Sequence, residues 1–143
     1  MQFAIITHRM SAKSENHPMT YTFSDRIGFE FFLQDHHMGS GIGTGAKGVR
    51  YKDGTEIIAL CQSYYLDAGI AAEHLPAIFL HEEVELHDDS PDAHFKATLA
   101  EYTYVWDTSG TEGLFDYHNR LSRLLGGDNT TRNSALQTIL SKK

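Results

Sequence analysis

The spacing of apolar residues changes near Ala71, and this change predicts two kinds of structure along the chain. Before Ala71, short apolar runs with β-branched residues are separated by turn residues, which is typical of strands. After it, apolar residues recur every three or four positions, which predicts helices. The pattern therefore predicts a helix-dominated α+β fold with a small N-terminal antiparallel sheet or hairpin, and a single domain over residues 1–143.

The N-terminal part is predicted to hold short strands and one helix. Asp53-Gly54 is a strong hairpin signal between the last two strands, and Ser24 or Asp25 can cap a helix that runs to about Gln34. Residues 8–20 are polar and predict a loop, and Gly39–Gly48 predicts a flexible segment. The predicted strands are Gln2–Thr7, Val49–Tyr51 and Glu56–Leu60.

The C-terminal part is predicted to be a series of helices. Pro76 suits the first turn of a helix, where its missing N–H costs nothing. Ser90 is predicted to be the N-cap of the next helix, and Pro91 its first residue. The predicted helices cover about 66–73, 76–88, 91–107, 112–125 and 130–141.

Composition and charge argue against two classes of binding partner, nucleic acids and membranes. The net charge of −7 argues against binding nucleic acid by phosphate neutralisation, and no apolar run is long enough to cross a bilayer. Cys61 is the only cysteine, so an internal disulfide is excluded, and a buried structural thiol is expected. Because the N-terminus has no signal-peptide pattern, the expected location is cytoplasmic.

Candidate chemistry concentrates on the helix that follows Pro76. With Ile78 at zero on a helical wheel, His81, Glu85 and Glu82 fall near about 300°, 340° and 40°, between two apolar flanks. Carboxylates in a partly apolar setting must be paired, protonated or bound to a metal. At i and i+4, His81 and Glu85 can both reach one ion, and Glu82 can orient a metal-bound water.

The next helix carries a second set of metal-ligand residue types. His94 and Glu101 are seven residues apart and fall within about 20° of each other on one helical face. Ala97 and Thr98 lie between them on that face and are small enough for a neighbouring helix to approach closely. A tight turn between the two helices would place His94 and Glu101 opposite His81 and Glu85.

The run His81-Glu82-Glu83-Val84-Glu85 resembles the metal-binding helix of zincin-like metallopeptidases, whose usual pattern is H-E-x-x-H. It is more similar to the H-E-x-x-E variant of small, often phage-encoded proteins that have a later histidine on the next helix. The resemblance covers about 21 residues, and Glu85 stands where the second histidine is usual. It implies zinc as the metal, His81 and His94 as ligands, Glu82 as general base, and Glu101 as a ligand or a residue that contacts one.

The leading prediction is therefore a zinc-dependent, peptidase-like hydrolase with His81, His94 and Glu85 or Glu101 as ligands, acting on a peptide or small molecule. The Gly39–Gly48 loop would gate access to the site.

Two alternatives stay open, and a structural zinc site without turnover lies between the hydrolase and the first of them. In a non-enzymatic binding or inhibitory protein of phage origin, the same histidines and glutamates would pair across a helical hairpin, and a protein partner is expected. In an HD-type metal-dependent phosphohydrolase, His87-Asp88 would act with an earlier histidine and a distant aspartate. His36 or His37 and Asp107 are the candidates for those two positions.

Overall fold

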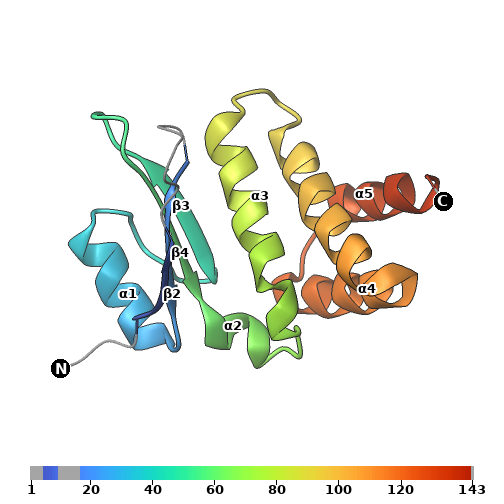
Figure 1. The fold of residues 1–143 in the computed structure, drawn as a ribbon, viewed down its shortest axis with the longest axis horizontal. Helices are drawn as coiled ribbons and strands as arrows, with labels where there is room; N and C mark the ends of the chain where they lie inside the picture. The colour runs from blue at the N-terminus through green and yellow to red at the C-terminus, as the bar shows by residue number, and fades with distance from the viewer. Residues whose placement is uncertain (1–4, 10–16, 143) are drawn as a thin grey trace. The chain divides into compact units, whose positions relative to one another are not determined.

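The computed structural model describes residues 5–9 and 17–142 of the chain (Figure 1). It is an α+β fold dominated by helices, with a small N-terminal sheet, which confirms the fold class predicted from the sequence. The chain divides into two compact units, the first ending at Tyr64 and the second beginning at Tyr65. That these units form a single domain stays a prediction.

The first unit is built on a four-stranded mixed sheet with the order β1-β2-β4-β3. The β1–β2 and β3–β4 pairs are antiparallel, whereas β2 and β4 run parallel. The sheet was predicted to be antiparallel, and it is mixed because of the β2–β4 pair. Asp53-Gly54 lies in the β3–β4 turn, which confirms the predicted hairpin. The strands are β1 (Ile5–Arg9), β2 (Met19–Phe23), β3 (Ala46–Arg50) and β4 (Glu56–Cys61).

The loop predicted over residues 8–20 is wrong at both of its ends. Residues 8 and 9 belong to β1, and β2 begins at Met19, while residues 10–16 lie outside the described part. In β2, Thr20 and Thr22 are buried although they are polar. Threonine and tyrosine favour strands through their shape, so a polarity-based loop prediction missed this strand.

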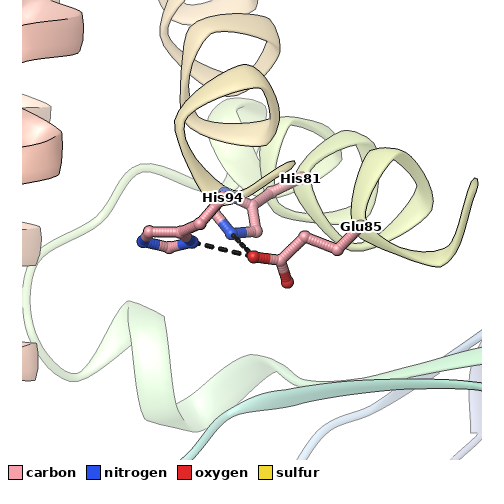
Figure 2. A group of neighbouring side chains, drawn as sticks. All are labelled: His81, Glu85 and His94. Atoms are coloured by element: carbon pink, nitrogen blue, oxygen red, sulfur yellow. Dashed lines mark hydrogen bonds and ion pairs between the residues drawn. The ribbon is translucent and has the colours of Figure 1, made fainter. Parts of the chain in front are cut away.

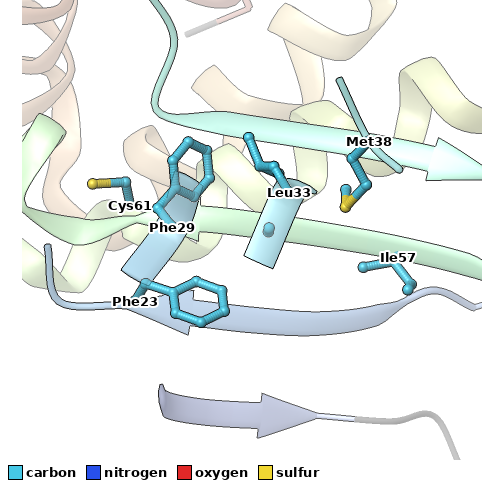
Figure 3. Packing of buried hydrophobic residues seen from close by; sticks show 7 residues of the cluster. Phe23, Phe29, Leu33, Met38, Ile57 and Cys61 are labelled. Atoms are coloured by element: carbon cyan, nitrogen blue, oxygen red, sulfur yellow. The ribbon is translucent and has the colours of Figure 1, made fainter. Parts of the chain in front are cut away.

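One helix packs on this sheet and completes the core of the first unit. Helix α1 (Arg26–Asp35) begins where the sequence predicts, and the Asp25 carboxylate caps it by accepting the Gly28 N–H at 2.9 Å. Its residues Phe29 and Leu33 are fully buried against strand residues (Figure 3). The lone thiol of Cys61 is buried in the same cluster, which confirms the expected burial. The cluster comprises Phe23, Phe29, Leu33, Met38, Ile57, Ala59 and Cys61.

The glycine-rich segment is held against α1 by charged groups. The Arg26 guanidinium donates to the Gly41 carbonyl at 2.9 Å, and Glu30 accepts the Gly41 N–H at 3.2 Å. A side chain at Gly41 would meet Leu33, Glu30 and Phe29 at 2.7–2.8 Å, so only glycine fits this approach. The last residues of the Gly39–Gly48 segment, from Ala46 onward, belong to strand β3.

The second unit consists of helices. The helix predicted over residues 66–73 is wrong. Helix α2 ends at Leu66, and a turn with Gly69 at φ 90° leads to a short 3-10 helix. Pro76 lies in the first turn of α3, as predicted. The elements are α2 (Gln62–Leu66, crossing the unit boundary), the 3-10 helix (Ala72–His74), α3 (Leu75–His87), α4 (Ala93–Leu125) and α5 (Thr130–Leu140).

Helix α4 begins later than predicted. Asp92, not Ser90, is its N-cap, and the Ser90 hydroxyl lies between the carboxylates of Asp88 and Asp92 at 2.5 and 2.7 Å. These local bonds stabilise a turn over residues 90–92, because short polar side chains compete with the helix for backbone groups.

No helix in the described part of the chain is both long and apolar enough to cross a bilayer.

Gly110 breaks α4 into two halves, residues 93–109 and 111–125, much as the separate helices 91–107 and 112–125 were predicted. Its φ of 75° and ψ of −172° are not helical. A hydrogen bond from the Tyr117 hydroxyl to the Glu101 carboxylate, and one between Tyr102 and His118, join the two halves side by side. At the break, the Ser109 hydroxyl contacts the His74 imidazole at 2.6 Å.

Replacing Gly110 tests the cost of this break. Its backbone region is essentially restricted to glycine, so Gly110→Ala is expected to lower the free energy of unfolding by about 1–3 kcal/mol. The cost comes from the backbone, because an added side chain would meet open space. Urea unfolding measures the change, and Glu112→Ala at an exposed helical position is the control. Equal stability of both variants would contradict the expectation.

Candidate metal centre

The second unit brings three of the predicted ligand residues together at one point. His81 and Glu85 come from successive turns of α3, and His94 comes from the first turn of α4. One donor atom from each lies within 4.8 Å of the other two, and the side chains point toward one another (Figure 2). This His-Glu-His group can hold a metal ion.

The distances within the group suit a small tetrahedral cation. The Glu85 Oε2 atom lies 3.2 Å from His81 Nε2 and 2.8 Å from His94 Nδ1. Two ligands at about 2.1 Å from a tetrahedral ion lie about 3.4 Å apart. The His81–Glu85 pair is within a few tenths of an ångström of that value, whereas the Glu85–His94 pair is about 0.6 Å shorter, so His94 has to move outward for an ion to bind.

Burial is graded across the three ligands. The His81 side chain is 8% exposed, Glu85 35% and His94 52%. The group therefore has one side in the protein interior and one side in contact with solvent. Solvent contact on the His94 side leaves room for a water or a substrate atom as a further ligand.

Glu101 is not one of the three clustered ligands, because it lies on the other nitrogen of His81. Its Oε1 atom is 2.8 Å from His81 Nδ1, and its side chain is 1% exposed. Both Glu101 oxygens are 3.2 Å from Arg132 Nη1, and Oε2 also accepts the Tyr117 hydroxyl at 2.5 Å. Glu101 thus contacts His81, one of the three candidate ligands, and its role in a metal centre stays a prediction.

Electrostatics make the ring of His81 a bridge between two carboxylates. Burial lowers the pKa of His81, but hydrogen bonds and charge from Glu101 and Glu85 outweigh burial and raise the pKa to about 9. The bond to His81 likewise lowers the pKa of Glu85 to about 2 against the effect of burial. With no metal bound, His81 is therefore an imidazolium that donates one N–H to each carboxylate.

The Glu101 carboxylate stays ionised in the interior. Burial opposes its ionisation, but Arg132 and then His81 hold its pKa below the ordinary value. The same surroundings raise the pKa of Tyr117, first through burial and then through the Glu101 charge. Tyr117 is therefore a neutral donor to an anionic carboxylate.

Glu82 differs from the other acids of the site because it has no hydrogen-bond partner among the described residues. Burial is the main cause that raises its pKa to about 7, and the charges of His81, Glu85, Glu101 and Arg132 all act on it. A carboxyl group that is half ionised near neutral pH and lies beside a ligand group has the properties of a general base.

The HD-type assignment gains no comparable cluster. Among the side chains that the structure describes, those of residues 17–142, the His81–Glu85–His94 group is the only set of this kind. Asp88 instead accepts hydrogen bonds from Ser90 and pairs with Lys96 at 3.1 Å. His36 contacts the Phe32 carbonyl and stacks on the Phe32 ring.

Sequence reasoning missed two residues that contact the site, Tyr117 and Arg132. Both lie on helical faces that are otherwise apolar: Tyr117 with Leu114 and Leu121, and Arg132 with Ala135, Leu136 and Ile139. An arginine within a buried stripe at helical spacing requires a buried anion, and this was the available signal.

The pH dependence of stability in metal-free protein tests the His81 bridge. Because the His81 pKa rises from 6.5 to about 9 on folding, its contribution is complete below pH 6.5 and is lost as pH rises through 9. Because the Glu85 pKa falls from 4.5 to about 2, its contribution is complete above pH 4.5 and is lost as pH falls through 2. Stability from this group is therefore expected to be greatest between pH 4.5 and 6.5.

Urea unfolding with a chelator present, at several pH values between 6.5 and 9, measures the alkaline loss. His81→Gln keeps a hydrogen-bonding side chain without a titrating ring, so its stability should change less over this range. If the variant and the natural protein lose stability in parallel, His81 is not the group responsible.

Comparison with known proteins adds no relative to this description. The chain matches no protein-family model, no curated protein and no solved structure. The function of this protein is therefore inferred from the arrangement of its side chains and from the zincin resemblance.

Proposed function

We propose that this protein is a zinc-dependent hydrolase of the peptidase-like kind, with its centre on α3 and α4. His81, Glu85 and His94 are the zinc ligands, Glu82 is the general base, and a peptide or a small molecule is the substrate. The proposal keeps the ligands predicted from the sequence except Glu101, which acts through His81.

One observation supports this proposal above the others: a three-donor cluster on two helices lies beside the carboxyl group of Glu82, which has no hydrogen-bond partner among the described residues. Catalytic zinc sites use three protein ligands and leave a further position for water or substrate, whereas structural sites are closed by four. The half-exposed His94 side of the cluster is consistent with that open position.

The chemistry follows from the charges in the group. A zinc ion lowers the pKa of a water that it binds to about 7. Glu82, with its own pKa raised to about 7, is matched to accept that proton and to return it to a leaving group. Histidine nitrogens and a carboxylate oxygen are all donors that zinc accepts, and one carboxylate leaves the bound ion with net positive charge.

The resemblance of His81–Glu85 to the H-E-x-x-E form of the zincin helix supports the same roles for His81 and Glu82. We also propose a cytoplasmic location and a phage origin for the protein. The predicted gate over Gly39–Gly48 belongs to the first unit, whereas all of the proposed ligands belong to the second, and the gate stays a prediction.

A second candidate is a non-enzymatic binding or inhibitory protein. The observation in its favour is that Glu85 already pairs with both imidazoles, so protein atoms alone satisfy these three groups. In that case the network only joins α3 to α4, and the protein acts by binding a protein partner.

Zinc content separates these candidates. Protein purified without a histidine tag is expected to hold about one zinc per chain, measured by elemental analysis, if three ligands and a water complete the site. His81→Ala and His94→Ala should each lose the metal, because each removes one of three protein ligands. His87→Ala, which removes an exposed imidazole at the end of α3, is the matched control and should keep it. A natural protein that takes up no zinc would overturn the hydrolase.

Glu82→Gln tests the catalytic assignment separately from metal binding. The variant should retain zinc and lose about 10²–10⁴-fold in kcat, since a general base contributes that much and glutamine cannot accept a proton. Hydrolysis is followed with zinc-loaded protein and a mixture of quenched fluorescent peptides, and p-nitrophenyl acetate serves as a small-molecule probe. Glu83→Gln makes the same chemical change one residue along and should keep full activity. Zinc binding with unchanged turnover in Glu82→Gln would show that Glu82 is not the base.

A further inference from the structure

Glu101 accepts hydrogen bonds from three helical segments. His81 of α3, Tyr117 of the second half of α4, and Arg132 of α5 all contact its carboxylate. Glu101 itself lies in the first half of α4 and is 1% exposed. Arg132 and Glu101 are 31 residues apart in the chain, so the contact depends on the tertiary fold.

We propose that Arg132, assisted by Tyr117, is a positioning residue that sets the metal affinity of the His81–Glu85–His94 group. This inference rests on the metal centre of the proposed function. Arg132 and Tyr117 hold Glu101 on Nδ1 of His81, and this bond directs Nε2 of the same ring toward Glu85 and His94. Helix α5 thereby controls a centre to which it contributes no ligand.

The physical basis is the coupling between a histidine ligand and the acceptor on its other nitrogen. A carboxylate there keeps the proton on Nδ1, leaves the lone pair on Nε2, fixes the ring orientation and raises ligand basicity. The acceptor does this fully only while it is ionised, and Glu101 is buried, so it needs a nearby cation. Arg132 supplies that charge from a side chain that is itself 10% exposed.

The guanidinium of Arg132 is itself held in place. One nitrogen, Nη1, lies 3.2 Å from both oxygens of Glu101, and the guanidinium carbon lies 5.7 Å from the centre of the Tyr102 ring. The adjacent Asn133 accepts from His118 Nε2 at 3.0 Å, and the Tyr102 hydroxyl bonds His118 Nδ1 at 2.7 Å. This second network anchors α5 to α4 without contacting Glu101.

The two networks provide a matched pair of variants. Tyr117→Phe removes a hydroxyl that bonds Glu101, whereas Tyr102→Phe keeps every hydrogen bond to Glu101: it removes a hydroxyl that bonds His118 and also interacts with Arg132, and it keeps the ring beside Arg132. Both tyrosines are fully buried residues of α4, so the two changes carry similar structural costs. Arg132→Met removes the charge and keeps a long apolar side chain.

The experiment measures zinc affinity of each full-length variant by competition with a chromogenic chelator, after circular dichroism has verified folding. Arg132→Met is expected to bind zinc 10–100-fold more weakly, the usual effect of losing support behind a histidine ligand. Tyr117→Phe should show a smaller loss, and Tyr102→Phe should bind like the natural protein. The absorption spectrum of bound Co²⁺ should change in Arg132→Met and Tyr117→Phe alone, because a role in stability does not alter the ligand field.

Each outcome is decisive. If Arg132→Met does not fold, the comparison of Tyr117→Phe with Tyr102→Phe still decides the question. If the natural protein binds zinc and the two tyrosine variants match it in affinity and Co²⁺ spectrum, the positioning role is overturned while the hydrolase proposal stands. If both tyrosine variants lose affinity equally, the effect is general and the positioning role is again overturned. If the natural protein binds no zinc, the positioning role and the proposed function fail together.

Discussion

The second unit depends on one buried carboxylate and the cation that faces it. Glu101 is ionised although solvent barely reaches it, which is possible only because His81, Tyr117 and Arg132 all donate to it. Removing one partner of such a pair is strongly destabilising, since an uncompensated buried charge remains. The positions of α3, both halves of α4 and α5 are therefore linked through the two carboxylate oxygens of Glu101 and their three donor groups. The break at Gly110 serves the same constraint, because it lets Tyr117 return to the level of Glu101.

This constraint decides what the surface-facing part of the site can do. Glu101 acts on one nitrogen of His81, so the other nitrogen must point to Glu85 and His94. In metal-free protein a proton occupies that second nitrogen and is stabilised by two carboxylates. A metal ion would replace that proton, so binding is an exchange of one cation for another in a site already built for positive charge. The same acids that raise the pKa of His81 are thus those that would favour a bound cation.

Local helical geometry explains which parts of the site the sequence predicted. His81 and Glu85 share a face because they are four residues apart, and His94 follows after a turn short enough to bring α4 back along α3. The spacing of residues could not decide the role of Glu101. A metal ligand and a residue that hydrogen-bonds a ligand can occupy the same position on a helical face. Arg132 lies 31 residues further along, and no local pattern links it to Glu101. Strand β2 was missed for a related reason: its buried threonines are polar by composition and strand-forming by shape.

The gradient of burial bears on whether these pairs exist only for stability. An exposed pair such as His94 with Glu85 contributes little, because water and salt screen its charges and ordering the side chains costs entropy. A network selected for stability alone would gain more from an apolar contact at this edge of the helical pair. In the proposed metal centre, by contrast, the exposure of these two residues would give a substrate access to the ion. The buried end of the group, where His81 meets Glu101, then supplies the rigidity that a half-exposed ligand lacks. The combination of a fixed interior end and an accessible outer end is what a catalytic centre requires, and a structural ion pair requires only the first.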